Sequence, residues 1–455
     1  MNAGFGLSFV LMMLLGQGPN ELLDLLPSKD YWQHQGVEMT AENVLADLTA
    51  ADANTPAQGG QADVRRLMAI RTLGELRCKE ALPALRKLAD SKELFVADYA
   101  GRAIAAIEGR DAPRPGVSAA ERLQDVELLP AGCGLVAQYA LAPGAGPIDL
   151  AKVLAAMGPM AGPGPQEGGL DQLVKPLTEF AGMVGNLRVD AVTIGVAGEI
   201  DSDKGFVVVV ARGLYDAKRA AAALKETLDG RDAERTQTIG GLEVFYPDRE
   251  FGLIFASNQR LVLVSGPKRE LMPVEQVVAA VKAGKGTLRE DKELAKLIDA
   301  ADKTGRLWMA VRMGETYRKA HPMLEPFVSA ALVTKETKDA VEFSLLAQGD
   351  DADKVAAAVA QFNGELAKSV KGIKQAADKM PPLQPMAEFI ESIQASQSGK
   401  AVTITAKFAG KGSAVAMLMP LMFFCERAAP ATDTVRAEAV EQDAPPPPKA
   451  APERR

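Results

Sequence analysis

Histidine is almost missing from this 455-residue sequence, which contains only His34 and His321. Neither lies near a cysteine or the other histidine along the chain. A histidine-centred catalytic triad, a His-rich zinc site or a histidine proton relay therefore has little material from which to be built. We expect neither histidine to bind a metal ion.

Cysteine is scarce as well, and its three positions, Cys78, Cys133 and Cys425, are far apart in the sequence. An odd number at such spacing does not define a disulfide framework, and at most one bridge can form. Cys78 ends a helical segment and Cys425 closes an apolar run. We expect both to pack as small hydrophobic side chains.

Familiar catalytic motifs are absent: there is no Gly-x-Ser-x-Gly elbow, His-Glu-x-x-His pair, Cys-x-x-Cys pair or dinucleotide-binding glycine fingerprint. Residues Gly410 to Ser413 and Gly284 to Thr287 each contain a Gly-Lys pair. In a phosphate-binding loop the lysine directly precedes Ser or Thr, whereas glycine intervenes in both segments. We expect plain turns at both places.

Acidic residues alternate at Glu199, Asp201 and Asp203, where their oxygens could surround a calcium ion. A calcium loop starting at Asp201 requires glycine and glutamate where Phe206 and Arg212 stand. A solvated turn between two strands explains the acids instead. No catalytic, cofactor-binding or metal-binding residue is predicted, so we expect a protein that is not an enzyme and has no cofactor.

Clusters of positive charge are also lacking, since lysine and arginine are interspersed with acids throughout. The net charge is −7 and the isoelectric point is near 5.3. Nucleic acids and anionic membranes both attract clustered Lys and Arg. Neither is therefore expected as a main partner.

No apolar run reaches the roughly 20 residues that a membrane-spanning helix needs. The run Phe5 to Leu15 is followed by Gly16, Gln17 and Gly18, small residues suited to cleavage. Residues 1–18 are therefore predicted to be a signal peptide, so that the mature chain starts near Pro19. We expect an exported protein, either periplasmic or extracellular, with no transmembrane segment in its mature form.

A second apolar run, Ala414 to Cys425, is about 12 residues long and is interrupted by Pro420. It fits a buried terminal helix, or the wall of a site for an apolar ligand, because it contains Met417, Met419 and Met422. Residues 428–455 are rich in Ala, Pro and charge. That composition predicts a disordered tail.

What the sequence does contain is a helical pattern repeated over residues 62–108. Ala69, Leu73 and Leu76 recur 31 positions later as Ala100, Ile104 and Ile107. Leu82, Leu85 and Leu88 indicate a further helix between them, with Pro83 in its first turn.

This segment resembles a HEAT-like repeat protein, and the resemblance implies paired helices that present a surface to a protein partner. Residues 19–61 precede it as an N-terminal helical region with a helix near Thr40 to Ala50. Two repeats cannot bury a continuous core by themselves. Their apolar face must therefore pack on the rest of the chain or on another molecule; it comprises Val96, Tyr99, Ala100, Ala103, Ile104 and Ile107.

Residues 109–118 form a linker rich in Pro and Gly, and residues 119–427 are expected to form one α+β domain. Segments 192–224 and 328–360, which are 136 positions apart, share one order of strand, strand and helix. We interpret them as copies of a duplicated β-β-α unit. The strand at residues 401–409, followed by a helix from Ser413, is a candidate third copy.

Further strands are predicted at residues 243–246, 251–256 and 260–265, joined as a meander. Strands joined by hairpins and followed by helices indicate an antiparallel sheet with helices on one face. In this plan the remainder of the chain resembles uncharacterised exported bacterial α+β proteins.

These observations favour an exported non-enzymatic interaction or structural protein, in which the HEAT-like helices and the sheet domain face a protein partner. The first alternative is a carrier or sensor of an apolar ligand, suggested by the methionine-rich run. The second is a hydrolase of unrecognised type, whose acid pair cannot be located from the sequence.

Overall fold

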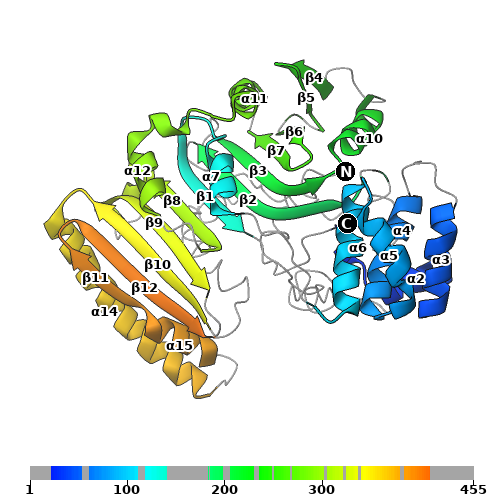
Figure 1. The fold of residues 1–455 in the computed structure, drawn as a ribbon. Helices are drawn as coiled ribbons and strands as arrows, with labels where there is room; N and C mark the ends of the chain where they lie inside the picture. The colour runs from blue at the N-terminus through cyan, green and yellow to red at the C-terminus, as the bar shows by residue number, and fades with distance from the viewer. Residues whose placement is uncertain are drawn as a thin grey trace, which may run out of the picture.

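The computed structural model divides into a helical unit and a large sheet with its own helices (Figure 1). It describes residues 22–53, 61–110, 118–140, 183, 185–197, 205–229, 235–247, 249, 251–266, 269–301, 305–320, 324–336, 340–379 and 384–409. The proposed signal peptide, the run at 414–425 and the tail at 428–455 lie outside these ranges.

The helical unit confirms the helices expected from the repeated pattern. Helix α4 packs on α3 and α6, and α5 packs on α6, so that two helical hairpins lie side by side. Pro83 lies in the first turn of α5, as expected. The elements are η1 (Leu22–Leu25), α2 (Ser28–His34), α3 (Ala41–Ala53), α4 (Gln61–Glu75), η2 (Lys79–Ala81), α5 (Leu82–Ala89) and α6 (Leu94–Ile107).

The apolar face of the repeat is covered within the helical unit itself. Five of its six residues are buried in the unit's own core, and Ile104 packs against them. Trp32 of α2 also lies in this core and donates its indole N–H to the Thr72 hydroxyl at 2.9 Å. Leu76, in contrast with its counterpart Ile107, is 37% exposed. The similarity of the helical unit to HEAT repeats stays a prediction.

Among the described residues, twelve strands form one antiparallel sheet in the order β11-β12-β10-β9-β8-β1-β2-β3-β7-β6-β5-β4. The predicted strands are confirmed. Their bounds are β1 (Cys133–Ala140), β2 (Leu187–Ala197), β3 (Phe206–Tyr215), β4 (Thr236–Ile239), β5 (Leu242–Phe245), β6 (Phe251–Ser257), β7 (Arg260–Ser265), β8 (Leu307–Arg312), β9 (Phe327–Glu336), β10 (Ala340–Gly349), β11 (Gln394–Ser398) and β12 (Ala401–Ala409).

The proposed duplication matches the layout of this sheet. Strands β1 and β8 pair at its centre, β2 and β3 follow on one side, and β9 and β10 follow on the other. Helix α10 (Ala217–Asp229) comes after β3, as α14 (Ala352–Ala377) comes after β10. The two β-β-α units therefore occupy corresponding positions on either side of the β1 and β8 pair.

The candidate third copy stays a prediction. Strand β12 pairs with β10, which is the position that β7 holds beside β3. It therefore completes the second half of the sheet, with β11 as the edge strand. The local strand pattern could not reveal this, because the pattern does not specify which strand is the neighbour. The helix expected from Ser413 lies outside the described residues.

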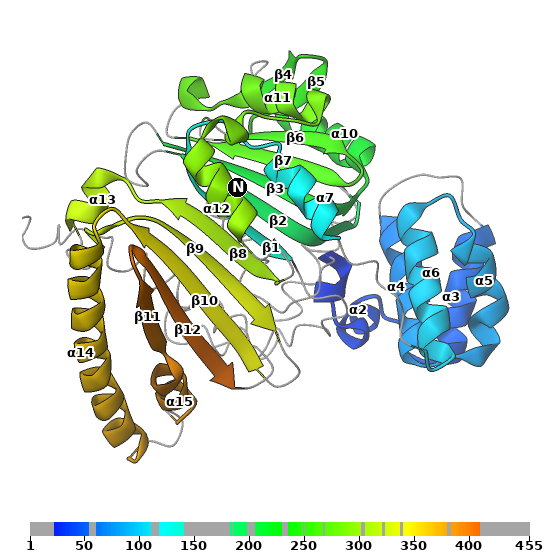
Figure 2. The same cartoon turned by 60° about the vertical axis from the view of Figure 1, so that its left-hand side comes forward.

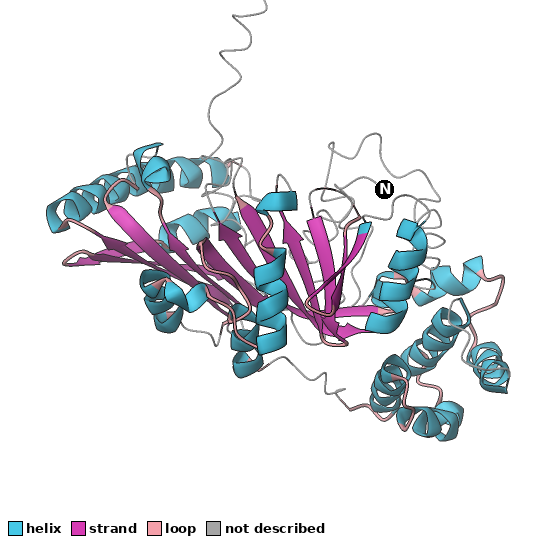
Figure 3. Ribbon diagram, turned by 90° about the horizontal axis from the view of Figure 1, so that it is seen from above, coloured by secondary structure: helices cyan, strands magenta, loops and turns pink. Residues whose placement is uncertain are grey.

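The helices cover both faces of the sheet, which corrects the expectation of one (Figure 3). Leu294 of α12 packs with Trp308 of β8 on one face, which we call face A. Phe389 of α15 packs with Phe343 of β10 on the opposite face, face B. Figure 2 shows α7 and α12 on the face A side. The remaining helices are α7 (Ala119–Val126), η5 (Arg269–Leu271), α11 (Val274–Ala283), η6 (Leu288–Glu290), α12 (Lys292–Ala300), α13 (Glu315–Ala320) and α15 (Gln384–Ser392).

The α+β class with an antiparallel sheet is thus confirmed, and a face B side chain can be recognised from the register. Residues directly opposite each other in an antiparallel pair lie on the same side of the sheet. Leu307 is opposite Thr334, which is opposite Phe343, so all three belong to face B. Alternate residues of the same strands, such as Trp308, belong to face A.

Candidate functional site

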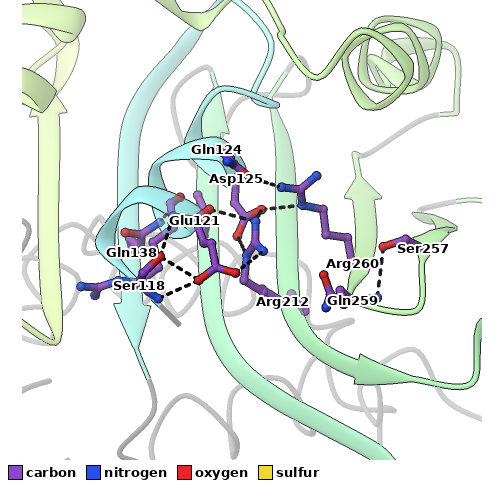
Figure 4. Close-up of polar contacts among 12 residues, drawn as sticks. Ser118, Glu121, Gln124, Asp125, Gln138, Arg212, Ser257, Gln259 and Arg260 are labelled. Atoms are coloured by element: carbon purple, nitrogen blue, oxygen red, sulfur yellow. Dashed lines mark hydrogen bonds and ion pairs between the residues drawn. The ribbon is translucent and has the colours of Figure 1, made fainter. Parts of the chain in front are cut away.

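The most concentrated polar cluster lies where α7 meets β3 and β7 on face A (Figure 4). The Asp125 side chain is 1% exposed and accepts two hydrogen bonds from Arg212, at 2.6 and 2.7 Å. Arg260 donates a third at 2.9 Å and reaches Gln124 at 2.8 Å. Arg212 also donates to the backbone carbonyl of Glu121 at 2.8 Å.

These contacts form a structural clamp rather than a reactive centre. Both oxygens of the Asp125 carboxylate accept hydrogen bonds from arginine, and two cations, Arg212 and Arg260, pair with it. A capping box between Ser118 and Glu121 fixes the start of the same helix. The cluster therefore fastens α7 to strands β3 and β7.

A second buried polar group fastens α7 to the centre of the sheet. Gln138 of β1 donates to the Arg122 carbonyl at 2.7 Å and to the Thr193 hydroxyl at 2.8 Å. Its side-chain oxygen accepts a hydrogen bond from the Trp308 indole at 3.0 Å. Because its amide already has these partners, Gln138 acts as a structural link.

The helical unit is joined to the sheet domain by charged contacts at the start of β2. Arg188 pairs with Asp98 of α6 at 3.0 Å, and Arg219 of α10 pairs with Asp63 of α4 at 2.6 Å. Leu187 packs against the core of the helical unit. The unit is therefore docked on the sheet domain by both charge and packing.

The cysteine and histidine positions give no site among the described residues. Cys78 and Cys133 are buried free thiols, which confirms the packing expected for Cys78. Burial raises the pKa of the Cys133 thiol to about 12. His34 lies exposed at the end of α2. Cys425 and His321 lie outside the described residues.

The residues of the loop Gly284 to Thr287 make contacts that hold the fold together. Gly284 ends α11 with a positive φ of 68°, and the amide of Gly286 donates to the Glu127 carbonyl. The Thr287 hydroxyl accepts from the Ala131 amide at 2.8 Å. The loop thus ties α11 to the segment between α7 and β1. The other sequence candidates, Glu199, Asp201, Asp203 and Gly410 to Ser413, lie outside the described residues.

In the part of the chain that the structure describes, no three His, Cys, Asp or Glu side chains gather in a way that could hold a metal ion. A search of the same residues for a helix both long and apolar enough to cross a bilayer found none.

The feature that stands apart from these structural contacts is the middle of face B. Three rows of opposite residues cross the central strands there, and they consist only of apolar side chains and the Tyr139 ring. We call this surface the central apolar face. It comprises Leu135, Ala137 and Tyr139 of β1, Val192, Ile194 and Val196 of β2, Val207, Val209 and Ala211 of β3, and Leu307, Met309 and Val311 of β8.

The described helices on this side make their main contacts with the sheet at its two ends. Helix α10 contacts β6 and β4, whereas α14 and α15 contact β11 and β12. The central apolar face lies between these two groups of helices. Five of its twelve residues are buried, at 3 to 8% exposure, and the other seven are half-buried; the buried ones are Tyr139, Val192, Val209, Leu307 and Met309.

Sequence reasoning found strands β2 and β3 of this face but not the face itself. The alternation of Val192, Ile194 and Val196 is visible in the sequence. Strand β8 was missed because Leu307 to Val311 is a continuous apolar run without alternation. Strands β1 and β8 are distant in the sequence, so no local signal shows that they are neighbours.

Comparison with known proteins adds little to this picture. No protein-family model and no curated protein sequence matches the chain. Crystal forms III, I and IV of TP0453 are similar at TM-scores of 0.34, 0.35 and 0.33 and at 9, 10 and 10% identity. The matches cover 64, 66 and 64% of this chain and 96, 96 and 95% of the respective TP0453 chains. Such low scores carry no argument about function.

Proposed function

We propose that this protein is a non-enzymatic binding protein for an apolar ligand, and that the ligand lies on the central apolar face. The observation that carries the proposal is the run of three apolar rows across four neighbouring strands, with α10 contacting the sheet on one side of them and α14 and α15 on the other. The polar clusters of the described residues have structural partners, which leaves this face as the best-supported binding surface. An exported location, suggested by the run Phe5 to Leu15, belongs to the same proposal.

The chemistry of the face indicates the class of ligand. Its twelve side chains include no charged group, and the Tyr139 phenol is the single polar function among them. A ligand with a long hydrocarbon portion gains about 0.8 kcal/mol for each methylene that leaves water. An ionic or sugar-like ligand would lose many hydrogen bonds with water and would meet only one polar group there, the Tyr139 phenol.

This proposal differs from a protein that binds through its repeat helices. The residues that suggested such a surface, including Val96 and Tyr99, are buried in the core of the helical unit. The helical unit then has a supporting role, because it packs against Leu187 where β2 begins. Its contacts with Arg188 and Arg219 hold one end of the sheet in place.

The test measures the binding of a fluorescent 16-carbon fatty acid to the full chain and to the Ile194→Gln variant. Ile194 is half-buried in the middle row of the face, and a polar amide there should weaken binding about tenfold. The matched control is Leu346→Gln on face A, where Leu346 is 39% exposed. Equal affinities for the two variants, with unchanged melting temperatures, would contradict the proposal.

A protein partner on the helical unit is the second candidate. It is favoured by Leu94, which begins α6 and is 50% exposed. An exposed leucine contributes to binding when a partner removes its apolar surface from water. Leu94→Ser should then weaken capture of that partner from an extract without changing fatty-acid binding.

A further inference from the structure

The end of the sheet formed by β10, β12 and β11 has an open surface on face A. Three rows of opposite residues cross these strands there, and the row of Ser344 continues through Val333 to Trp308, which identifies the side. We call this surface the polar face. Seven of its nine residues are exposed, and the other two, Thr403 and Ala401, are half-buried. The rows are Ser344, Thr405 and Gln394, then Leu346, Thr403 and Ser396, then Gln348, Ala401 and Ser398.

The helices at this end of the sheet pack on the opposite side. In the described part of the chain, α14 and α15 make the main helix contacts with β11 and β12. Val355 of α14 packs in one cluster with Val402, and Phe389 of α15 packs with Phe343, both on face B. Figure 2 shows these strands at the end of the sheet that lies away from the helical unit. The described helices therefore leave the polar face open.

The two halves of the sheet differ in how they fill these positions. Three positions of the first half are apolar and fully buried, whereas hydroxyl side chains stand at their second-half equivalents; the pairs are Val208 and Ser344, Val264 and Thr405, and Ile254 and Ser396. Charged residues begin only in the next row, with Lys335, Glu342 and Lys407. The polar face is thus neutral with charge at its border. Depletion of charge at the centre and a polar rim are typical of binding surfaces.

The side chains of the polar face suit a ligand that is neutral and rich in hydroxyl groups. Five of the nine carry hydroxyls, two carry amides and none is charged. Hydroxyls and amides both donate and accept hydrogen bonds, as sugar hydroxyls do. Gln348 and Ser396 donate to backbone carbonyls at 3.4 and 3.5 Å, and a ligand can replace such weak bonds. Leu346, 39% exposed in the middle row, offers apolar surface to the C–H groups of a sugar ring.

The size of the polar face distinguishes a glycan from a second copy of the chain. Three strands about 4.8 Å apart and three rows about 6.7 Å apart cover roughly 300 Å². A stable interface between two proteins covers about 800 Å² on each partner. The neutral surface is well below that area, but it can hold one slender chain of sugars.

We propose that the polar face binds an uncharged glycan, through hydrogen bonds with Ser344 and Thr405 and apolar contact with Leu346. A neutral glycan is favoured over an anionic one, because the three rows contain no cation to pair with an anion. The site is independent of the proposed function, since it lies on the opposite face of the sheet and uses different residues.

The test measures the binding of a neutral oligosaccharide of six N-acetylglucosamine units to the full chain by isothermal titration calorimetry. The double variant Ser344→Ala, Thr405→Val removes two hydroxyls with little change of shape and should weaken binding about tenfold. Thr238→Val is the matched control, because Thr238 is exposed on β4 at the opposite edge of the sheet. Equal melting temperatures show that the proteins compared are folded alike.

Weaker binding by the double variant, together with unchanged binding by Thr238→Val, supports the inference. It would be overturned if the wild-type chain did not bind the oligosaccharide at millimolar concentration, or if the double variant bound it as tightly as the wild type. Analytical ultracentrifugation provides the remaining check. A dimer that the double variant dissociates would assign the polar face to a second copy of the chain and would overturn the glycan site.

Discussion

Glycine at position 74 allows α4 and α6 to approach each other closely. A Cβ atom there would lie 2.8 Å from the Cα atom of Ala103, and that backbone atom cannot move without moving α6. Gly74→Ala should therefore separate the two helices and destabilise the protein by about 1 to 3 kcal/mol. Gly101→Ala is the control, since nothing lies within 4 Å of its added methyl group. Thermal unfolding of both variants tests this prediction. Equal melting temperatures would contradict the close packing of α4 on α6.

Asp125 is the residue whose charge matters most for α7. The Asp125→Asn substitution leaves Arg212, whose side chain is 7% exposed, with only the more distant Glu121 carboxylate, at 3.8 Å, as a charged partner. Breaking such a buried pair costs about 3 to 5 kcal/mol. Glu293→Gln changes the exposed pair with Lys296 and should have no measurable effect. Urea unfolding of the two variants tests the difference, and a small loss for Asp125→Asn would show that the clamp is unimportant.

Cys133 should respond to pH in a defined direction. Burial raises its pKa in the folded protein to about 12, whereas an unfolded thiol ionises near 8.5 to 9. The neutral thiol therefore contributes stability fully below about pH 8.5, and this contribution is lost as the pH rises to about 12. Labelling with a thiol reagent at pH 8 should reach Cys133 only when the protein unfolds. Rapid labelling of the folded protein would show that the site is open.

At the scale of elements, the register of α4 follows from its buried side. Leu73 is fully buried in the helical core, and Glu75 pairs with Arg71 at the surface. Leu73→Asp should destabilise the protein by several kcal/mol, because a carboxylate in that core has no partner. Glu75→Ala should change the melting temperature little. If the two variants melt together, the helical register is wrong.

The two halves of the sheet differ on face A, although their strands correspond. Val208 and Val210 of β3 are fully buried beneath helices, whereas Ser344 and Leu346 occupy the equivalent positions of β10 and are exposed. The face A positions of β10 that no described helix buries therefore include a polar residue, Ser344, where β3 has valine. On face B, Val209 of β3 is matched by another apolar residue, Leu345 of β10.

At the scale of the whole molecule, local patterns predicted the elements but not their arrangement. Helical spacing identified α4 to α6, and alternation identified β2, β3, β9 and β10. Strand β11, Gln394–Ser398, was missed because its polar composition carries no such signal. The face covered by each helix was also mispredicted, because it depends on contacts between distant residues. The central apolar face arises only when β1 pairs with β8, so no single stretch of sequence contains it.

The most direct test of the central claim is to locate a bound apolar ligand. A 16-carbon fatty acid with a photoreactive diazirine near its methyl end is bound to the full chain and activated by light. Mass spectrometry then maps the labelled peptides. The account predicts labels on Leu135 to Tyr139 of β1 and on Val192 to Val196 of β2, and their loss when unlabelled fatty acid is added in excess. Labels confined to the helical unit, or to face A around Leu346, would contradict it.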